Sequence, residues 1–156
     1  MNFLKTTMLT FTLAIGMTIL ATPAHAQHCT AAKLAGNWAF TLNGTLILPT
    51  GPVPIAAVGT ATLEANGTLS GTEARSVGGQ YAQETSDGSF SVNPDCTGTI
   101  TVNFYEDGQL VRTSVLSFVV DTANTEIRMV QASLTLPDGT VLPAIVTVEA
   151  KRMLLQ

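Results

Sequence analysis

The chain has 156 residues, with seven Lys and Arg against eleven Asp and Glu, and only 6% of its residues are aromatic. An acidic chain without a run of basic residues lacks the positive surface that a phosphate backbone requires, so nucleic acid is not an expected partner. The same lack of a Lys/Arg cluster argues against binding to an anionic membrane surface.

Residues 1–26 have the features of a cleavable secretory signal. A short start with one lysine precedes an apolar run at residues 8–20, which is shorter than the roughly 20 residues of a membrane-spanning helix. The tripeptide Ala24-His25-Ala26 then offers small side chains at the positions that signal peptidase reads, so cleavage after Ala26 is expected. The predicted mature protein, residues 27–156, is one domain that is periplasmic or extracellular.

Both cysteines, Cys29 and Cys96, lie in the predicted mature protein. An even number of cysteines in an exported chain favours a disulfide. By restricting the unfolded chain, a bridge across so long a loop would contribute about 4 kcal/mol to stability. A redox or metal-binding pair is less consistent with the sequence, because CxxC spacing and histidine partners are missing.

From residue 37 onward, apolar residues alternate with polar ones at period two. The sequence is interrupted by pairs that tolerate the backbone of hairpin turns: Asn66-Gly67, Gly78-Gly79, Asp87-Gly88, Asp107-Gly108 and Asp138-Gly139. The predicted strands are residues 37–48, 55–63, 68–77, 80–85, 89–92, 99–105, 109–120, 126–136 and 141–153. Such a series predicts an all-β fold, a single antiparallel up-and-down barrel of about eight strands, because closure removes exposed sheet edges.

An outer-membrane barrel would show a similar alternation. Such barrels carry aromatic girdles at both membrane interfaces. The predicted mature chain keeps one Trp, two Tyr and four Phe, too few for two girdles. We therefore expect a soluble barrel with no stable membrane insertion.

The first and last predicted strands carry two residues that are expected to close one end of the barrel. Trp38 and Phe40 alternate with polar neighbours, so their face should point inward. In the last strand Val146, Val148 and Arg152 share one face, which places a guanidinium group in phase with the core. A cation–π contact with Trp38 would stabilise that charge by about 0.5–2 kcal/mol. Trp38 and Arg152 are therefore assigned a structural role.

The segment after the first strand, residues 49–54, contains three prolines and is the least regular part of the predicted barrel. Rigid prolines at both ends suit the frame of a lid over an open barrel end. A plain turn explains the same residues, and the sequence leaves both interpretations open.

The third predicted strand holds the main candidate site residues, because Leu69, Glu73, Arg75 and Val77 fall on one face. If Leu69 and Val77 mark the interior, Glu73 and Arg75 project into the lumen, where burial demands pairing or a polar ligand. The alternatives are that the small polar face is the inner one, or that the two charged residues pair at the surface.

Two further arginines support the same argument more weakly. Arg112 is in phase with Leu116 and Phe118, so it joins Glu73 and Arg75 as a candidate ligand-binding residue. Arg128 is considered on similar grounds. A structural or surface role is the alternative for both arginines.

The sequence Gly36-Asn37-Trp38 at the start of the first strand, with an Arg near the end of the last, is similar to the pattern of the calycin superfamily, which includes lipocalins and avidins. The chain also resembles exported bacterial proteins with an allene-oxide-cyclase-like barrel. The segments that carry this resemblance are residues 34–40, 57–59, 93–99 and 150–152. The resemblance implies the barrel but no settled activity. An avidin-like biotin site would need several tryptophans, and the chain has one.

The chemically capable residues exclude several kinds of catalysis. His28, near the predicted new N-terminus, is the one histidine of the predicted mature chain. Ser/His/Asp or Cys/His catalysis and a histidine-rich metal site are therefore excluded, and neither a metal nor a cofactor is expected. A site inside the barrel would have to use carboxylate, guanidinium and hydroxyl groups.

Three functions remain consistent with the sequence. The favoured one is a non-enzymatic barrel that binds a small, largely apolar molecule in its lumen, as the calycin resemblance implies, and it requires a cavity of about a few hundred Å³. The second is an isomerase or cyclase that, like allene oxide cyclases, holds a reactive substrate in an apolar pocket, with Glu73 as its polar participant. The third is a structural component of the envelope or matrix, which would display an exposed apolar patch.

Overall fold

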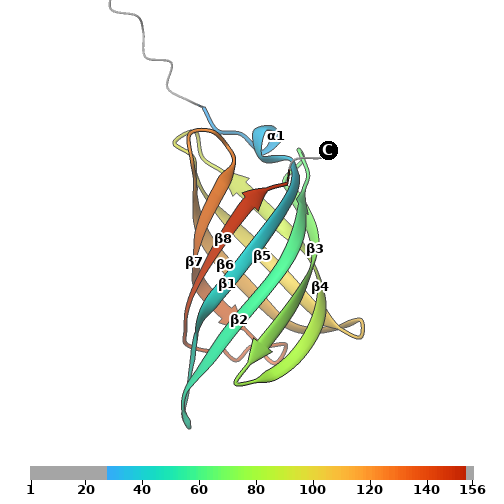
Figure 1. Ribbon diagram of the computed structural model, residues 1–156, viewed down its shortest axis with the longest axis vertical. Coiled ribbons are helices and arrows are strands. Elements are labelled where there is room, and N and C mark those ends of the chain that lie inside the picture. The colour runs from blue at the N-terminus through green and yellow to red at the C-terminus, as the bar shows by residue number, and fades with distance from the viewer. Residues whose placement is uncertain (1–27, 154–156) are drawn as a thin grey trace, which may run out of the picture.

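The computed structural model describes residues 28–153, so the predicted signal segment, residues 1–26, lies outside the described residues. Eight antiparallel strands close into a barrel in which each strand pairs with the next along the chain and the last pairs with the first (Figure 1). The strands are β1 (Gly36–Leu48), β2 (Gly51–Leu63), β3 (Thr68–Val77), β4 (Gln80–Val92), β5 (Thr97–Glu106), β6 (Gln109–Val120), β7 (Glu126–Thr135) and β8 (Ala144–Arg152). The predicted all-β, up-and-down barrel is confirmed.

The strands form because their apolar residues repeat with the period of a pleated chain. On β8, for example, Val146, Val148 and Ala150 are buried while the residues between them are exposed. The inward faces of the strands together form one continuous hydrophobic core, to which β5, β6 and β8 each contribute three buried residues. The exposed faces carry mainly Thr, Ser and other polar residues.

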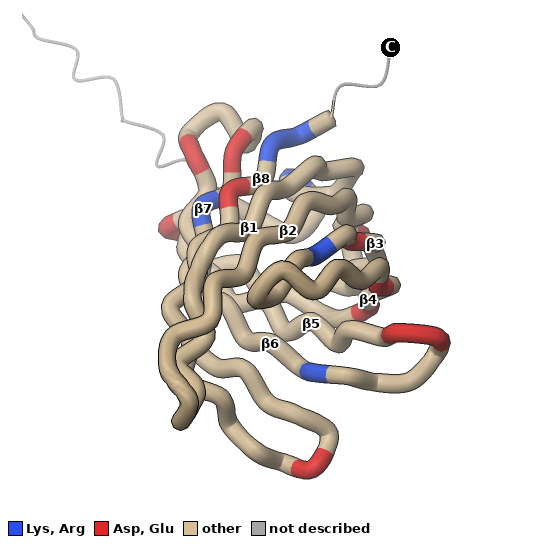
Figure 2. The backbone as a smooth tube through the Cα atoms, turned by 60° about the horizontal axis from the view of Figure 1, so that its bottom comes forward, with Lys and Arg blue, Asp and Glu red and all other residues tan. Residues whose placement is uncertain are grey.

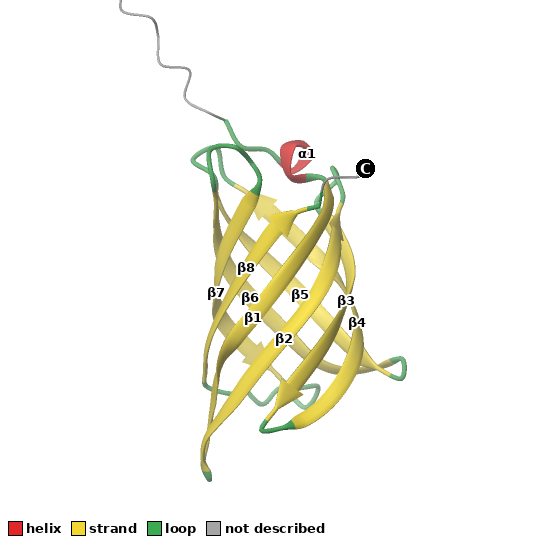
Figure 3. Cartoon of the chain, in the orientation of Figure 1, coloured by secondary structure: helices red, strands yellow, loops and turns green. Residues whose placement is uncertain are grey.

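The two ends of the barrel are different (Figure 3). At one end, called the capped end here, the helix α1 (Ala31–Leu34) lies across the barrel opening, and the described residues begin and end on this side. At the other end, called the open end, the strands are joined by the turns at residues 49–50, 78–79 and 107–108 and by the loop at residues 136–143. The described part of the chain contains no helix with the length and hydropathy of a membrane span.

The capped end is held by the contacts of Trp38 and Arg152. The indole Nε1 of Trp38, a residue with 1% exposure, donates to the carbonyl of Leu34 at 2.9 Å, which ties β1 to α1. The guanidinium group of Arg152 lies 4.6 Å from the centroid of the Trp38 ring. It also donates to the carbonyls of Lys33, Ala35 and Asn124. One arginine therefore joins the helix, the following turn and the β6–β7 turn.

The predicted disulfide between Cys29 and Cys96 is present. It connects the segment before α1 to the turn between β4 and β5. The bridge closes a loop with a sequence separation of 67 residues. It therefore fastens the N-terminal cap to the barrel wall.

The predicted turn at Asp87-Gly88 is wrong, and the two short strands expected on either side of it are one continuous strand, β4. Gly88 pairs with Leu69 on one side and with Val102 on the other. A side chain at Gly88 would collide with the carbonyl of Thr101, so glycine is needed there for a close approach of two strands. This correction reduces the nine possible strands to eight.

Of the two interpretations of residues 49–54, the plain turn is confirmed, but it is limited to residues 49–50, and no lid is formed. The strand β2 begins at Gly51, and Pro52 and Pro54 pair with Ile47 and Thr45 in a tight β1–β2 hairpin. The next strand, β3, pairs with β2 only from Ile55 onward, so both prolines lie where one side of β2 forms a sheet edge. At the other end of the chain, β8 begins at Ala144 instead of residue 141.

Candidate functional site

The lumen contains a cavity of about 250 Å³. It extends from Trp38 at the capped end to Leu46, Val77 and Leu142 near the open end, and most of the side chains around it are apolar. Small residues of β2 leave this space. Ala61 borders the cavity, and the ring of Phe40 packs against Gly59, where a side chain would collide with it. The lumen is therefore only partly filled by its own side chains.

Five charged side chains form the lumenal charge cluster: Glu73, Arg75, Glu84, Glu106 and Arg112. Arg112, on β6, donates from Nη2 to Oε1 of Glu73 and from Nη1 to Oε2 of Glu84, each at 2.5 Å. Arg75, on β3, donates from Nε to Oε1 of Glu84 at 2.5 Å and from Nη2 to Oε2 of Glu106 at 3.5 Å. Strands β3, β4, β5 and β6 are thus linked through one wall of the barrel.

Four of the five side chains are largely removed from water, whereas the Glu106 side chain, at the end of β5, is 44% exposed. Glu73 and Glu84 are 4% and 3% exposed, and they sit opposite each other in the β3–β4 register. The guanidinium group of Arg112 also lies 3.9 Å from the centroid of the Phe104 ring. Buried carboxylates are costly unless they are paired, and the two arginines supply that pairing.

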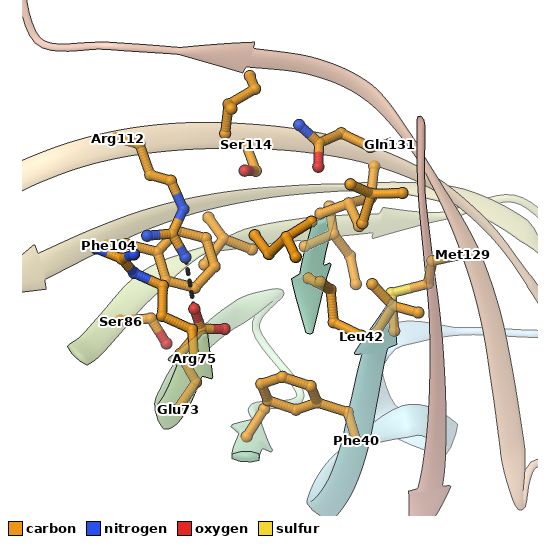
Figure 4. Close-up of a pocket in the computed structure, with 18 of the residues that line it drawn as sticks. Phe40, Leu42, Glu73, Arg75, Ser86, Phe104, Arg112, Ser114, Met129 and Gln131 are labelled. Atoms are coloured by element: carbon orange, nitrogen blue, oxygen red, sulfur yellow. Dashed lines mark hydrogen bonds and ion pairs between the residues drawn. The ribbon is translucent and has the colours of Figure 1, made fainter. Parts of the chain in front are cut away.

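One oxygen of Glu73 has no partner. Its Oε2 is buried and accepts no hydrogen bond, although Oε1 is bound to Arg112. Figure 4 shows the carboxyl group beneath the Arg112 guanidinium, at the side of the pocket that also contains Phe40. A buried polar atom without a partner is uncommon and identifies a place where a ligand group could bind.

The opposite wall offers a donor. The Nε2 of Gln131, on β7, is also buried without a hydrogen-bond partner, and Gln131 borders the same cavity. Strands β3 and β7 are four strands apart in a barrel of eight, so they face each other across the lumen. The cavity therefore has a free acceptor on one wall and a free donor on the other, with apolar side chains between them.

The two buried glutamates have opposite pKa shifts. Burial raises the pKa of Glu73 from 4.5 to about 7, and the neighbouring Glu84 carboxyl adds to this effect, while Arg112 opposes it. Burial would also raise the pKa of Glu84, but the charges and hydrogen bonds of Arg112 and Arg75 outweigh it, and that pKa lies below its usual value. Glu84 therefore stays ionised to a lower pH than an ordinary glutamate, and Glu73 is the group that exchanges a proton near neutral pH.

The three residues that the sequence singles out, Glu73, Arg75 and Arg112, come together in the lumen. Glu73 and Arg75 pair with other strands and do not form a surface pair with each other. Arg128 is different, because it lies on the outside, 70% exposed, and pairs with Glu126.

Sequence reasoning missed two members of the charge cluster, Glu84 and Glu106, and two residues that border the cavity, Ser114 and Gln131. Glu84 was hidden by the wrong turn at Asp87-Gly88, since counting back by twos from the inward Phe90 along one continuous strand reaches it. A rearrangement of register between β6 and β7 near Gln131 breaks the simple alternation there. Within residues 28–153, no group of three or more His, Cys, Asp and Glu side chains is arranged to hold a metal ion.

Comparison with known proteins supports the fold. No protein-family model matches the chain, and no curated protein sequence matches it. Among solved structures, the chain is similar to EF1p2_mFAP2b bound to DFHBI, with 12% identity, a TM-score of 0.56, and coverage of 80% of this chain and 100% of that one. It is also similar to the redesigned β-barrel mFAP1 bound to DFHBI, with 18% identity, a TM-score of 0.51, and coverage of 79% and 98%. The chain is thus similar to small antiparallel β-barrels, and its likeness to allene-oxide-cyclase-like barrels stays a prediction.

Proposed function

We propose that this protein is an exported barrel that binds a small, largely apolar molecule in its lumen. The observation that carries the proposal is the cavity of about 250 Å³, lined mainly by apolar side chains and reaching the open end. Ligand sites in proteins are typically concave and apolar with a few polar groups that fix orientation. The unpaired atoms of Glu73 and Gln131 are such groups.

Export is part of the proposal. The disulfide between Cys29 and Cys96 suits an oxidising compartment, and the signal-like segment at residues 1–26 supplies the route. Mass spectrometry of the protein purified from whole cultures of its own host would test this directly. Export predicts a mature N-terminus at Gln27, and an intact Met1 would contradict it.

The similar barrels support this proposal at the level of the fold. The redesigned β-barrel mFAP1 and the protein EF1p2_mFAP2b were both solved bound to the small molecule DFHBI. The fold is therefore compatible with binding a small molecule. The nature of the ligand has to come from the residues of this chain.

The experiment is a fluorescence titration with N-phenylnaphthylamine, a neutral apolar probe that brightens when it leaves water. The variant Ala61→Phe places a ring in the cavity, while Ala56→Phe places the same ring on the exposed face of the same strand. We expect saturable binding that Ala61→Phe weakens and Ala56→Phe preserves. Equal binding by the two variants would place the probe outside the lumen and contradict the proposal.

A second candidate function is an isomerase or cyclase that works by confinement. The observation that favours it is Glu73, a carboxyl group with a pKa of about 7 that faces an apolar cavity, because such a group can deliver or accept a proton at neutral pH. Incubation with fatty-acid epoxides would test it. Faster or stereoselective product formation that Glu73→Gln abolishes is expected, and the rate and stereochemistry of buffer alone would contradict it.

A structural role at the envelope has less support. That role calls for an exposed apolar patch, and the large apolar side chains on the outside are spread over several strands, including Val58 on β2, Tyr81 on β4, Val119 on β6 and Ile145 on β8. The lumen, in contrast, gathers its apolar surface around one cavity. The interior is therefore the better candidate for function.

A further inference from the structure

The lumenal charge cluster contains more negative than positive groups. Its three carboxyl groups belong to Glu73, Glu84 and Glu106, and its two guanidinium groups belong to Arg75 and Arg112. When all five are ionised, one negative charge is left over. The cluster becomes neutral if Glu73 holds a proton or if a cation arrives.

The position for that cation is defined by hydrogen bonding. Glu84 uses both oxygens on the two arginines, whereas Glu73 uses only Oε1. Glu73 borders the cavity, and its Oε2 is buried without a hydrogen-bond partner. A donor placed in the cavity can reach this oxygen without displacing an existing bond of the cluster.

The distribution of charge around the barrel favours a positive donor. At the open end the exposed charged side chains are acidic, with Glu106 and Asp107 at the β5–β6 hairpin and Asp138 in the β7–β8 loop (Figure 2). The basic side chains of residues 28–153 outside the cluster all lie at the capped end: Lys33, Arg128, Lys151 and Arg152. An acidic rim at the entrance raises the local concentration of cations and repels anions.

We propose that the ligand of the lumen is an apolar amine, whose protonated nitrogen pairs with the free oxygen of Glu73. This inference rests on the lumen-binding function proposed above. The ammonium group takes the place of the proton that Glu73 otherwise holds, so the cluster stays neutral. A hydroxyl group can donate to the same oxygen but adds no balancing charge, and a carboxylate adds a second negative charge.

Proton release accompanies this binding. The charged groups around Glu73 are Arg112 from β6, Glu84 from β4 and Arg75 from its own strand, with Glu106 joined through Arg75. The facing residue on β2 is Gly59, which carries no charge. Because the pKa of Glu73 is about 7, an amine must displace a proton at lower pH and meets an ionised carboxylate at higher pH. Amine affinity therefore rises with pH while alcohol affinity does not.

The test compares three probes with the same eight-carbon chain: octylamine, octanol and sodium octanoate. Their binding is measured by calorimetry at about pH 6 and about pH 8, on either side of the pKa of about 7. At the higher pH we expect octylamine to bind at least about tenfold more tightly than octanol, because charge-assisted hydrogen bonds are stronger than neutral ones. The preference should shrink at the lower pH, and octanoate should bind most weakly.

Two variants make the test specific. Glu73→Gln keeps an oxygen for Arg112 but removes the charge, so it should bind octanol and lose the preference for octylamine. The control Glu64→Gln removes a carboxylate from an exposed position next to the β2–β3 turn at the capped end, and it should keep that preference. If Glu73→Gln does not fold, the unaltered protein still provides the test. Its preference for octylamine over octanol should increase from about pH 6 to about pH 8 if the ionised Glu73 carboxylate binds the amine.

The outcomes separate the two proposals. Binding of octanol with no preference for octylamine would overturn the amine and leave lumen binding intact. Tighter binding of octanoate would also overturn it, by showing that the arginines select the ligand. Failure of all three probes to bind would contradict both proposals.

Discussion

Arg112 donates to one oxygen of Glu73 at 2.5 Å, and the other oxygen of that carboxyl group has no partner in the lumen. This half-satisfied pair explains why Glu73 and Glu84 differ, although they face each other on neighbouring strands and are equally buried. Glu84 receives bonds from two arginines, and Glu73 from one. The pair also connects the stability of the barrel to its proposed function. The unpaired oxygen of Glu73 lowers the stability of the barrel, and a ligand that donates a hydrogen bond to this oxygen can remove that cost.

The first prediction is a loss of stability as pH rises. The pKa of Glu73 is raised in the folded protein from 4.5 to about 7, so the folded state binds more protons than the unfolded state between these values. The Glu73 contribution is fully present below pH 4.5 and is lost as pH rises through about 7, at a cost on the order of 3 kcal/mol. Urea denaturation at several pH values should show this fall, and Glu73→Gln should remove it.

Glu84 provides a contrast for the same experiment. Its pKa is lowered, so its contribution is present above the ordinary value and is lost only as pH falls further. The two glutamates therefore act in separate pH ranges. A pH dependence between 4.5 and 7 that is identical in the unaltered protein and in Glu73→Gln would contradict the assignment to Glu73.

The second prediction concerns Arg112. The substitution Arg112→Met keeps much of the side-chain volume but leaves Glu73 and Glu84 without their shared partner, which should cost about 3–5 kcal/mol of unfolding free energy. Arg128→Met is the matched control, because Arg128 is exposed and pairs only with Glu126. That control should change stability little. Equal effects of the two substitutions in urea denaturation would contradict this prediction, by showing that the ion pairs of Arg112 contribute no more to stability than an exposed ion pair does.

The third prediction concerns the cap. Arg152→Lys keeps the charge but cannot hold the carbonyls of Lys33, Ala35 and Asn124 together or lie flat on Trp38. We expect a loss of about 1–3 kcal/mol and faster amide hydrogen exchange in α1. The exposed neighbour, Lys151, points outward, so Lys151→Gln should leave exchange in α1 unchanged. Unchanged exchange in Arg152→Lys would mean that the cap does not depend on this arginine.

The fourth prediction concerns the disulfide. Replacing both Cys29 and Cys96 with serine frees a loop with a sequence separation of 67 residues, and stability should fall by about 4 kcal/mol through the entropy of the unfolded chain. The measurement is urea denaturation of the double variant beside the oxidised protein. A midpoint that does not change would contradict a stabilising role for the bridge.

The barrel could be predicted because its signals are local. Alternation at period two and glycine-containing turns such as Asn66-Gly67 and Asp107-Gly108 are properties of neighbouring residues, and they identify strands directly. The prediction of a turn at Asp87-Gly88 is wrong because glycine is also needed where two strands approach closely. Here Gly88 of β4 lies against the Thr101 carbonyl of β5. That distinction depends on a partner strand that the local sequence does not reveal.

The site could be predicted only in part for a similar reason. Glu73, Arg75 and Arg112 share phase with apolar neighbours on their own strands, and this local signal identified them. Their partners, Glu84 and Glu106, lie on strands where the alternation is blurred by polar residues on both faces or by the strand end. Which carboxyl meets which guanidinium depends on the register of four strands, and only the closed barrel shows it.

The most direct test of lumen binding is a crystal structure of the protein with bromobenzene, a small apolar molecule whose bromine can be located by anomalous scattering. We predict a bromine peak inside the barrel, within the cavity bordered by Phe40, Phe104 and Gln131. The peak should disappear in Ala61→Phe crystals grown under the same conditions. Bromine peaks confined to the outer surface, or an empty lumen at saturating bromobenzene, would contradict the account.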